Sequence, residues 1–128
     1  MTLEGHLCSG LGEGAMFTGL DWVARQFCEK LGYAPHPGTL NLRLSGPDWA
    51  LARTRMQAAN GVAIEPPPGF CAAKCFEVLI NDSVRGAAIL PAVASYPADK
   101  LEIVAPVAVR EELRLNDGDR VTLQLQIE

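Results

Sequence analysis

Most of this sequence reads as short β-strands separated by turns, and this pattern is the strongest constraint on the fold. In residues 39–44 the apolar Leu40, Leu42 and Leu44 alternate with polar side chains, which is the period of a half-buried strand. Strands are predicted over residues 3–8, 16–18, 39–44, 61–65, 70–80, 84–90, 101–104 and 120–127. Many short strands with few helices favour a mainly β fold with a closed or nearly closed barrel over a doubly wound sheet.

Helical patterns are few and short. Apolar side chains at helical spacing predict an amphipathic helix over residues 21–31, which ends at Gly32. Shorter helices are expected over residues 49–56, after Pro47, and from Pro106 through residue 113. Residues 81–83 (Asn-Asp-Ser) predict a hairpin turn. No linker, repeat or low-complexity tract interrupts the 128 residues, so we expect a single domain over residues 1–128.

Composition and charge exclude several classes of protein. The net charge of −4 argues against nucleic acid as a partner bound through a broad basic face. The longest apolar run, residues 87–94, is too short to cross a membrane and contains Pro91, and no signal peptide is visible. The four cysteines have no paired zinc spacing. We therefore expect a monomeric, cytoplasmic protein with no membrane partner.

Two polar segments indicate chemistry on phosphates. Ser9-Gly10-Leu11-Gly12-Glu13-Gly14 follows the first predicted strand, and its glycines would let backbone N–H groups approach an anion. Thr39 and Asn41 lie two residues apart and would point to one face of a strand, as an oxygen-only Mg²⁺ site needs. Alone, the first segment is also compatible with a tight turn and the second with a polar outer face. Together they suggest phosphoryl transfer.

Five further motifs complete a resemblance to a known family. The segments Leu3-Glu4-Gly5, Pro37-Gly38-Thr39-Leu40-Asn41-Leu42, Glu102-Ile103-Val104-Ala105-Pro106, Arg110-Glu111 and Leu115-Asn116-Asp117-Gly118-Asp119 join the glycine-rich segment in order. In this the chain resembles the archaeal-type CTP-dependent riboflavin kinases, strongly over residues 3–44 and 84–125 and poorly over residues 45–80. The resemblance implies a small closed six-stranded cradle-loop barrel with one or two short flanking helices.

The resemblance also implies an activity and its ligands. The γ-phosphoryl group of CTP, the donor, would pass to the 5′-hydroxyl of riboflavin with one Mg²⁺ per site, giving FMN and CDP. The nucleotide-binding residues would be Gly10, Leu11, Gly12, Glu13, Gly14 and Ala15, with Val107, Ala108, Val109 and Arg110. Thr39 and Asn41 would hold the metal, Glu102 would bind the flavin and act as the catalytic carboxylate, and Ser95 would bind the flavin.

Two other function classes remain open from the sequence. Ala15 and Ala108 stand where the family pattern has basic residues, which favours a non-catalytic flavin- or nucleotide-binding regulatory module. Residues 115–121 also resemble the final segment of small-barrel DNA-binding regulators. The net negative charge and the Thr39–Asn41 pair argue against the DNA-binding alternative.

Overall fold

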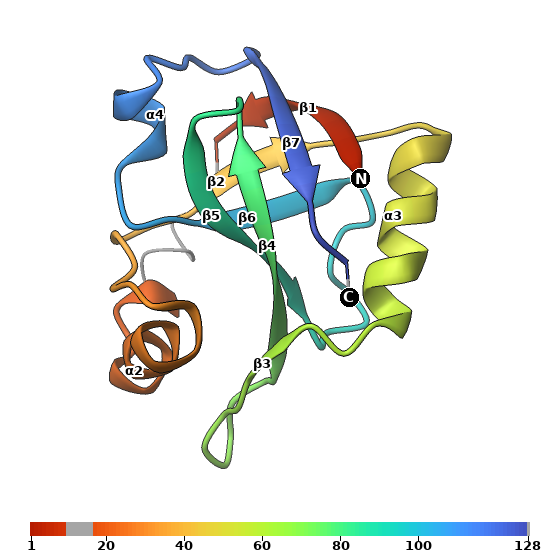
Figure 1. Cartoon of the computed structure of the whole chain (residues 1–128). Helices are drawn as coiled ribbons and strands as arrows, with labels where there is room; N and C mark the ends of the chain where they lie inside the picture. The colour runs from red at the N-terminus through yellow and green to blue at the C-terminus, as the bar shows by residue number, and fades with distance from the viewer. Residues whose placement is uncertain (10–16, 128) are drawn as a thin grey trace.

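The computed structural model describes residues 1–9 and 17–127, which form one β-barrel flanked by helices (Figure 1). The strands are β1 (Thr2–Cys8), β2 (Leu40–Arg43), β3 (Val62–Ile64), β4 (Ala73–Ile80), β5 (Val84–Pro91), β6 (Lys100–Val104) and β7 (Arg120–Leu125). The helices are α2 (Asp21–Leu31), α3 (Pro47–Ala58) and α4 (Val109–Glu112).

Six strands close into the barrel that the sequence predicts. They pair antiparallel in the order β4-β5-β6-β2-β1-β7, and β7 pairs back onto β4 to close the ring. The seventh strand, β3, adds to β4 outside this ring. The Asn81–Asp82 turn of the β4–β5 hairpin adopts positive φ at both residues, as predicted for a tight turn.

Two apolar clusters hold the helices against opposite faces of the sheet. The barrel interior contains Leu42, Ile80 and Leu123, and α3 adds Trp49, Ala52 and Met56 to the same cluster. The helix α2 packs on the outside of the barrel through Val23, Phe27 and Leu31, where it meets a second cluster that includes Cys75, Ile89 and Val104. In Figure 1, α2 and α3 accordingly lie on different sides of the barrel.

One backbone contact explains a glycine inside a strand. A Cβ atom added to Gly86 of β5 would lie 3.0 Å from the carbonyl oxygen of Val104 and 3.0 Å from Cγ2 of Ile103. A side chain there would require the neighbouring atoms of β6 to shift, so glycine lets β5 pass close to β6.

The structure corrects several predicted boundaries. The helix Asp21–Leu31 is confirmed, and Gly32 ends it in the left-handed region with φ of 84°. The strand predicted over residues 16–18 is wrong at Phe17 and Thr18, which are helical because the chain turns directly into α2. The helix α3 begins earlier than predicted, at Pro47, whereas α4 is confined to Val109–Glu112. No helix in residues 1–9 and 17–127 is long and apolar enough to span a membrane.

Candidate functional site

A row of three side chains crosses the outer face of β1, β2 and β6. Asn41 of β2 lies opposite Cys8 of β1 on one side and opposite Glu102 of β6 on the other. Directly opposed residues project to the same face with Cβ atoms about 4.5–5.5 Å apart. The strand register therefore makes a predicted metal ligand and the predicted catalytic carboxylate immediate neighbours.

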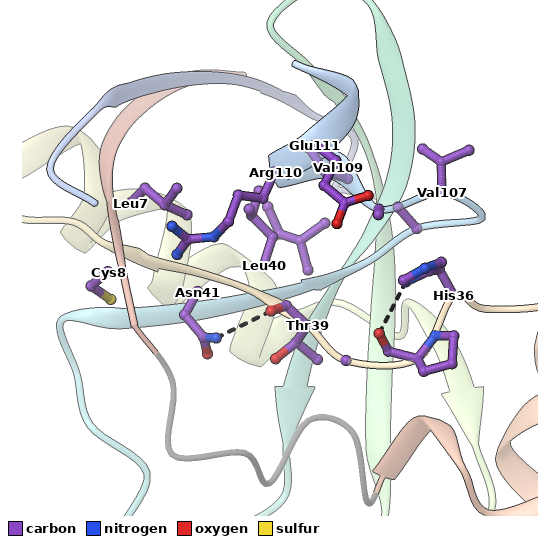
Figure 2. Close-up of a pocket in the computed structure, with 15 residues that line it drawn as sticks. Leu7, Cys8, His36, Thr39, Leu40, Asn41, Val107, Val109, Arg110 and Glu111 are labelled. Carbon is purple, nitrogen blue, oxygen red and sulfur yellow. Dashed lines mark hydrogen bonds between the residues drawn. The ribbon is translucent and has the colours of Figure 1, made fainter. Parts of the chain in front are cut away.

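Asn41 is more deeply buried than a polar outer face implies. Its relative exposure is 8%, and its side-chain Nδ2 donates a hydrogen bond of 3.2 Å to the carbonyl oxygen of Thr39 (Figure 2). The other amide atom, Oδ1, is buried and accepts no hydrogen bond from the described residues. An unpaired buried acceptor costs free energy unless a ligand satisfies it. This oxygen is therefore a suitable ligand for a hard cation.

Asn41 and Thr39 line a cavity of about 200 Å³ whose wall also includes the second predicted nucleotide segment, residues 107–110. Figure 2 shows the cavity between the end of β1, the loop before β2 and the start of α4. Val107, Ala108, Val109 and Arg110 all contribute to its lining. The structure therefore brings the predicted metal pair and the second nucleotide segment to one site. The other nucleotide segment, Gly10 to Ala15, lies outside the described residues.

The donor set at this cavity fits a magnesium ion. A hydroxyl at Thr39 and an unpaired amide oxygen at Asn41 are neutral oxygen donors, which suit Mg²⁺ when phosphate oxygens and water complete its shell. Within the described ranges, no group of three or more His, Cys, Asp or Glu side chains could hold a metal.

Asp117, to which the sequence analysis gave no role, links the two nucleotide segments. Asp117 accepts a hydrogen bond of 2.7 Å from the Ser9 hydroxyl and forms an ion pair of 2.7 Å with Nη2 of Arg110. The hydrogen bond from Ser9 and then that from Arg110 lower the pKa of the Asp117 carboxyl. Ser9 directly precedes the glycine-rich segment, so Asp117 ties its start to α4.

Glu102 has a cationic partner that the sequence analysis missed. Nζ of Lys100 lies 3.0 Å from Oε1 of Glu102, and both side chains are largely shielded from solvent, at 24% and 16% exposure. The two residues are separated by one position on β6, so the period of a strand places them on the same face. Glu102 does not line the cavity of Thr39 and Asn41. It lies beside this cavity, as the strand neighbour of Asn41.

Ser95 lies apart from this site. It is exposed, in the irregular segment between β5 and β6, and it does not line the cavity of Thr39 and Asn41. Burial raises the pKa of the neighbouring Tyr96 hydroxyl, and the charge of Glu102 raises it further. Flavin binding by Ser95 stays a prediction, at a position outside the cavity of Thr39 and Asn41.

Comparison with known families and proteins identifies the family of this chain. The model of the CTP-dependent riboflavin kinase family, described as domain of unknown function DUF120, matches residues 7–125. The chain belongs to this family. It is 40% identical to a riboflavin kinase of Aeropyrum pernix over 95% of this chain and 93% of that protein. It is also 38% identical to a riboflavin kinase of Pyrobaculum islandicum, over 98% of this chain and 61% of the relative.

Several relatives in the family are longer than this chain. A riboflavin kinase of Methanosarcina barkeri is 37% identical over 98% of this chain, which corresponds to 57% of the relative. The chain thus spans little more than half the length of several curated relatives that it matches.

The link through Asp117 predicts a measurable titration in this family member. We expect Ser9→Ala and Arg110→Gln each to raise the pKa of Asp117 toward the ordinary value of about 3.9, with the larger change for Ser9→Ala. NMR titration of the Asp117 carboxyl carbon measures this pKa. Because the folded-state pKa is lowered, the link stabilises the fold above the unfolded-state pKa and is lost as the pH falls through the folded-state value.

Glu4→Gln is the control for this titration, because it breaks the ion pair of Glu4 with Arg120 elsewhere on the barrel. It should leave the Asp117 titration unchanged. An Asp117 pKa that stays the same in both Ser9→Ala and Arg110→Gln would show that the link does not exist in solution.

Proposed function

We propose that this protein is a CTP-dependent riboflavin kinase that transfers the γ-phosphoryl group of CTP to the 5′-hydroxyl of riboflavin. The observation that carries the proposal is the unpaired, buried Oδ1 of Asn41, which lies beside Glu102 at a cavity lined by the nucleotide segment 107–110. Family membership supports the same reaction, and the family name supports CTP as the donor.

The metal in this proposal is Mg²⁺, held by Oδ1 of Asn41 and the hydroxyl of Thr39. When bound, the ion neutralises phosphate charge and helps align the reacting groups. The Nδ2 hydrogen bond to the Thr39 carbonyl orients the amide so that Oδ1 is left for a ligand. We therefore expect the Asn41 oxygen to bind the ion with little rearrangement of its side chain.

The nucleotide is proposed to bind between the glycine-rich segment and the segment Val107 to Arg110. Arg110 supplies positive charge near the phosphates, and Asp117 holds the guanidinium in place through its 2.7 Å ion pair. Ala108 provides no charge where the family pattern has a basic residue, so Arg110 carries more of the electrostatic attraction in this chain. The N–H groups of Gly10, Gly12 and Gly14 are proposed to bind phosphate oxygens.

Glu102 is proposed to orient the 5′-hydroxyl of riboflavin and accept its proton as the new bond to phosphorus forms. Its register opposite Asn41 supports this role, because Glu102 is the direct strand neighbour of a proposed metal ligand. Lys100 contacts Oε1 of Glu102, and we propose that this contact keeps the carboxylate in one orientation. Lys100 is a positioning residue in this scheme.

The direct test of the function is product formation. The protein is incubated with riboflavin, Mg²⁺ and either CTP or ATP, and FMN is quantified by chromatography. We expect FMN with CTP in clear preference to ATP, because the family resemblance selects the cytosine base. If riboflavin binds but neither nucleotide gives FMN, the protein is a non-catalytic flavin-binding module and the kinase proposal is wrong.

The metal assignment predicts that Asn41→Ala loses phosphoryl transfer by orders of magnitude, because charge neutralisation and alignment both need this ligand. The free energy of unfolding without ligands should change by about 1 kcal/mol or less, since the variant loses one hydrogen bond and also an unpaired buried acceptor. Steady-state kinetics and urea denaturation measure the two effects. Normal turnover in Asn41→Ala would show that Asn41 does not bind the catalytic metal.

The assignment of Glu102 as a proton acceptor predicts that Glu102→Gln lowers kcat by about 10²- to 10⁴-fold. The affinities for CDP and Mg²⁺ should stay close to wild type, because the substituted side chain keeps its shape. Glu77→Gln is a matched control, since Glu77 is a strand carboxylate paired with Arg85 at 2.6 Å, away from Glu102. A Glu102→Gln protein that keeps kcat and loses Mg²⁺ affinity would make Glu102 a metal ligand instead.

A further inference from the structure

The thiol of Cys8 lies beside the proposed metal pair, and the proposed mechanism does not use it. Cys8 is the last residue of β1, is half-buried and forms no disulfide. It lines the same cavity of about 200 Å³ as Thr39 and Asn41, whereas the other three cysteines of the chain do not. A sulfur atom therefore stands next to a site whose other proposed protein ligands are oxygens.

The strand register brings this sulfur and the unpaired oxygen of Asn41 together. Cys8 lies directly opposite Asn41, so their Cβ atoms are about 4.5–5.5 Å apart on one face of the sheet. Figure 2 shows the two side chains next to each other at one end of the cavity. Asn41 is only 8% exposed, and its Oδ1 accepts no hydrogen bond from the described residues. Metal bonds of about 2.3 Å to sulfur and about 2.0–2.2 Å to oxygen would let one ion contact both atoms.

A sulfur ligand changes which cations this cavity favours. Mg²⁺ prefers oxygen ligands and gains nothing from a thiol, whereas thiolate ligands favour Zn²⁺ and softer cations such as Cd²⁺. When such an ion binds, the Cys8 thiol loses its proton to solvent and its sulfur forms a bond to the metal. The bound thiolate cancels one unit of the ion's positive charge, so less charge remains to neutralise phosphate oxygens.

We propose that the Cys8 sulfur and Oδ1 of Asn41 together bind a thiophilic divalent cation such as Zn²⁺ or Cd²⁺, which displaces Mg²⁺ and inhibits phosphoryl transfer. The inference rests on the proposed function, in which Asn41 is a ligand of Mg²⁺, and it adds an inhibitory metal to the same site. Thr39 and Asn41 alone would favour hard cations. Cys8 gives this chain its sensitivity to soft ones.

Cd²⁺ is the probe for binding, because a cadmium–thiolate bond gives an ultraviolet charge-transfer absorption that oxygen ligands do not give. The background protein carries Cys28→Ser and Cys71→Ser, which remove the two exposed thiols. Burial raises the pKa of the Cys75 thiol to about 12, so this group stays protonated at neutral pH. We expect the absorption of the background protein to saturate at one Cd²⁺ per chain.

Three substitutions in this background identify the ligands. Cys8→Ser and Cys8→Ala should each abolish the absorption, because the Cys8 sulfur supplies it. Asn41→Ala keeps the sulfur and should weaken Cd²⁺ binding by at least about 10-fold, a loss typical even of groups that only support a metal ligand. Asn60→Ala is the matched control, since it removes an exposed amide outside the cavity and should bind Cd²⁺ like the background protein. Circular dichroism checks that each variant is folded.

Inhibition of FMN formation supplies the second readout. Zn²⁺ is added to the assay with riboflavin, CTP and Mg²⁺, and the rate of each variant is divided by its own rate without Zn²⁺. We expect Cys8→Ser to require at least about 10-fold more Zn²⁺ for half inhibition than wild type. Cys28→Ser should be as sensitive as wild type, and raising the Mg²⁺ concentration should relieve the inhibition of wild type.

Three results would each overturn this inference while leaving the kinase proposal intact. They are a charge-transfer absorption that persists in Cys8→Ser, Cd²⁺ binding that is unaffected by Asn41→Ala, and equal Zn²⁺ sensitivity in wild type and Cys8→Ser. Failure of the proposed function looks different, because no FMN would form with either nucleotide. The Cd²⁺ titration of the free protein would still decide whether Cys8 and Asn41 bind one ion.

Discussion

The pairing of β4 with β7 is the contact on which the rest of the structure depends. It sets Val78 opposite Leu125 and Ile80 opposite Leu123, and it closes the six strands into a ring. Closure removes the free edges of those strands and fixes the order of β1, β2 and β6. A slip of one residue in β2 would turn Leu42 outward and Asn41 into the interior. The chemistry proposed here therefore rests on strand register.

Local patterns in the sequence predicted most of the fold. Helical spacing and Gly32 located α2, and the Asn81–Asp82 turn located the β4–β5 hairpin. The closing pair of β4 and β7 has no local signal, because its partners are more than forty residues apart. The strand expected at residues 16–18 was wrong at Phe17 and Thr18, since so short a segment carries no period that would distinguish a strand from a helical turn.

The site was predicted in part, for similar reasons. The two-residue spacing of Thr39 and Asn41 agrees with their lining of one cavity, whereas the segment 107–110 in the same lining came from the family resemblance. The roles of these residues remain predictions. The contact between Ser9 and Asp117 spans 108 positions and has no sequence signature. Lys100 could have been found, because its spacing from Glu102 fits one face of a strand. The segment before β6 has no strand or helix period, so the sequence could not predict that Tyr96 is more buried than Ser95.

The hydrogen bonds between Met1 and Leu125 have a consequence for how this barrel can be handled. The amino group of Met1 donates to the Leu125 carbonyl at 2.9 Å, and the N–H of Leu125 donates to the Met1 carbonyl at 2.8 Å. Figure 1 shows the start of β1 and the end of β7 on the side of the barrel where α3 lies. Joining them would cost little loop-closure entropy, so the barrel suits circular permutation with new ends in the Asn81–Ser83 turn. For the same reason it can be inserted into a surface loop of a host protein without forcing the host's strands apart.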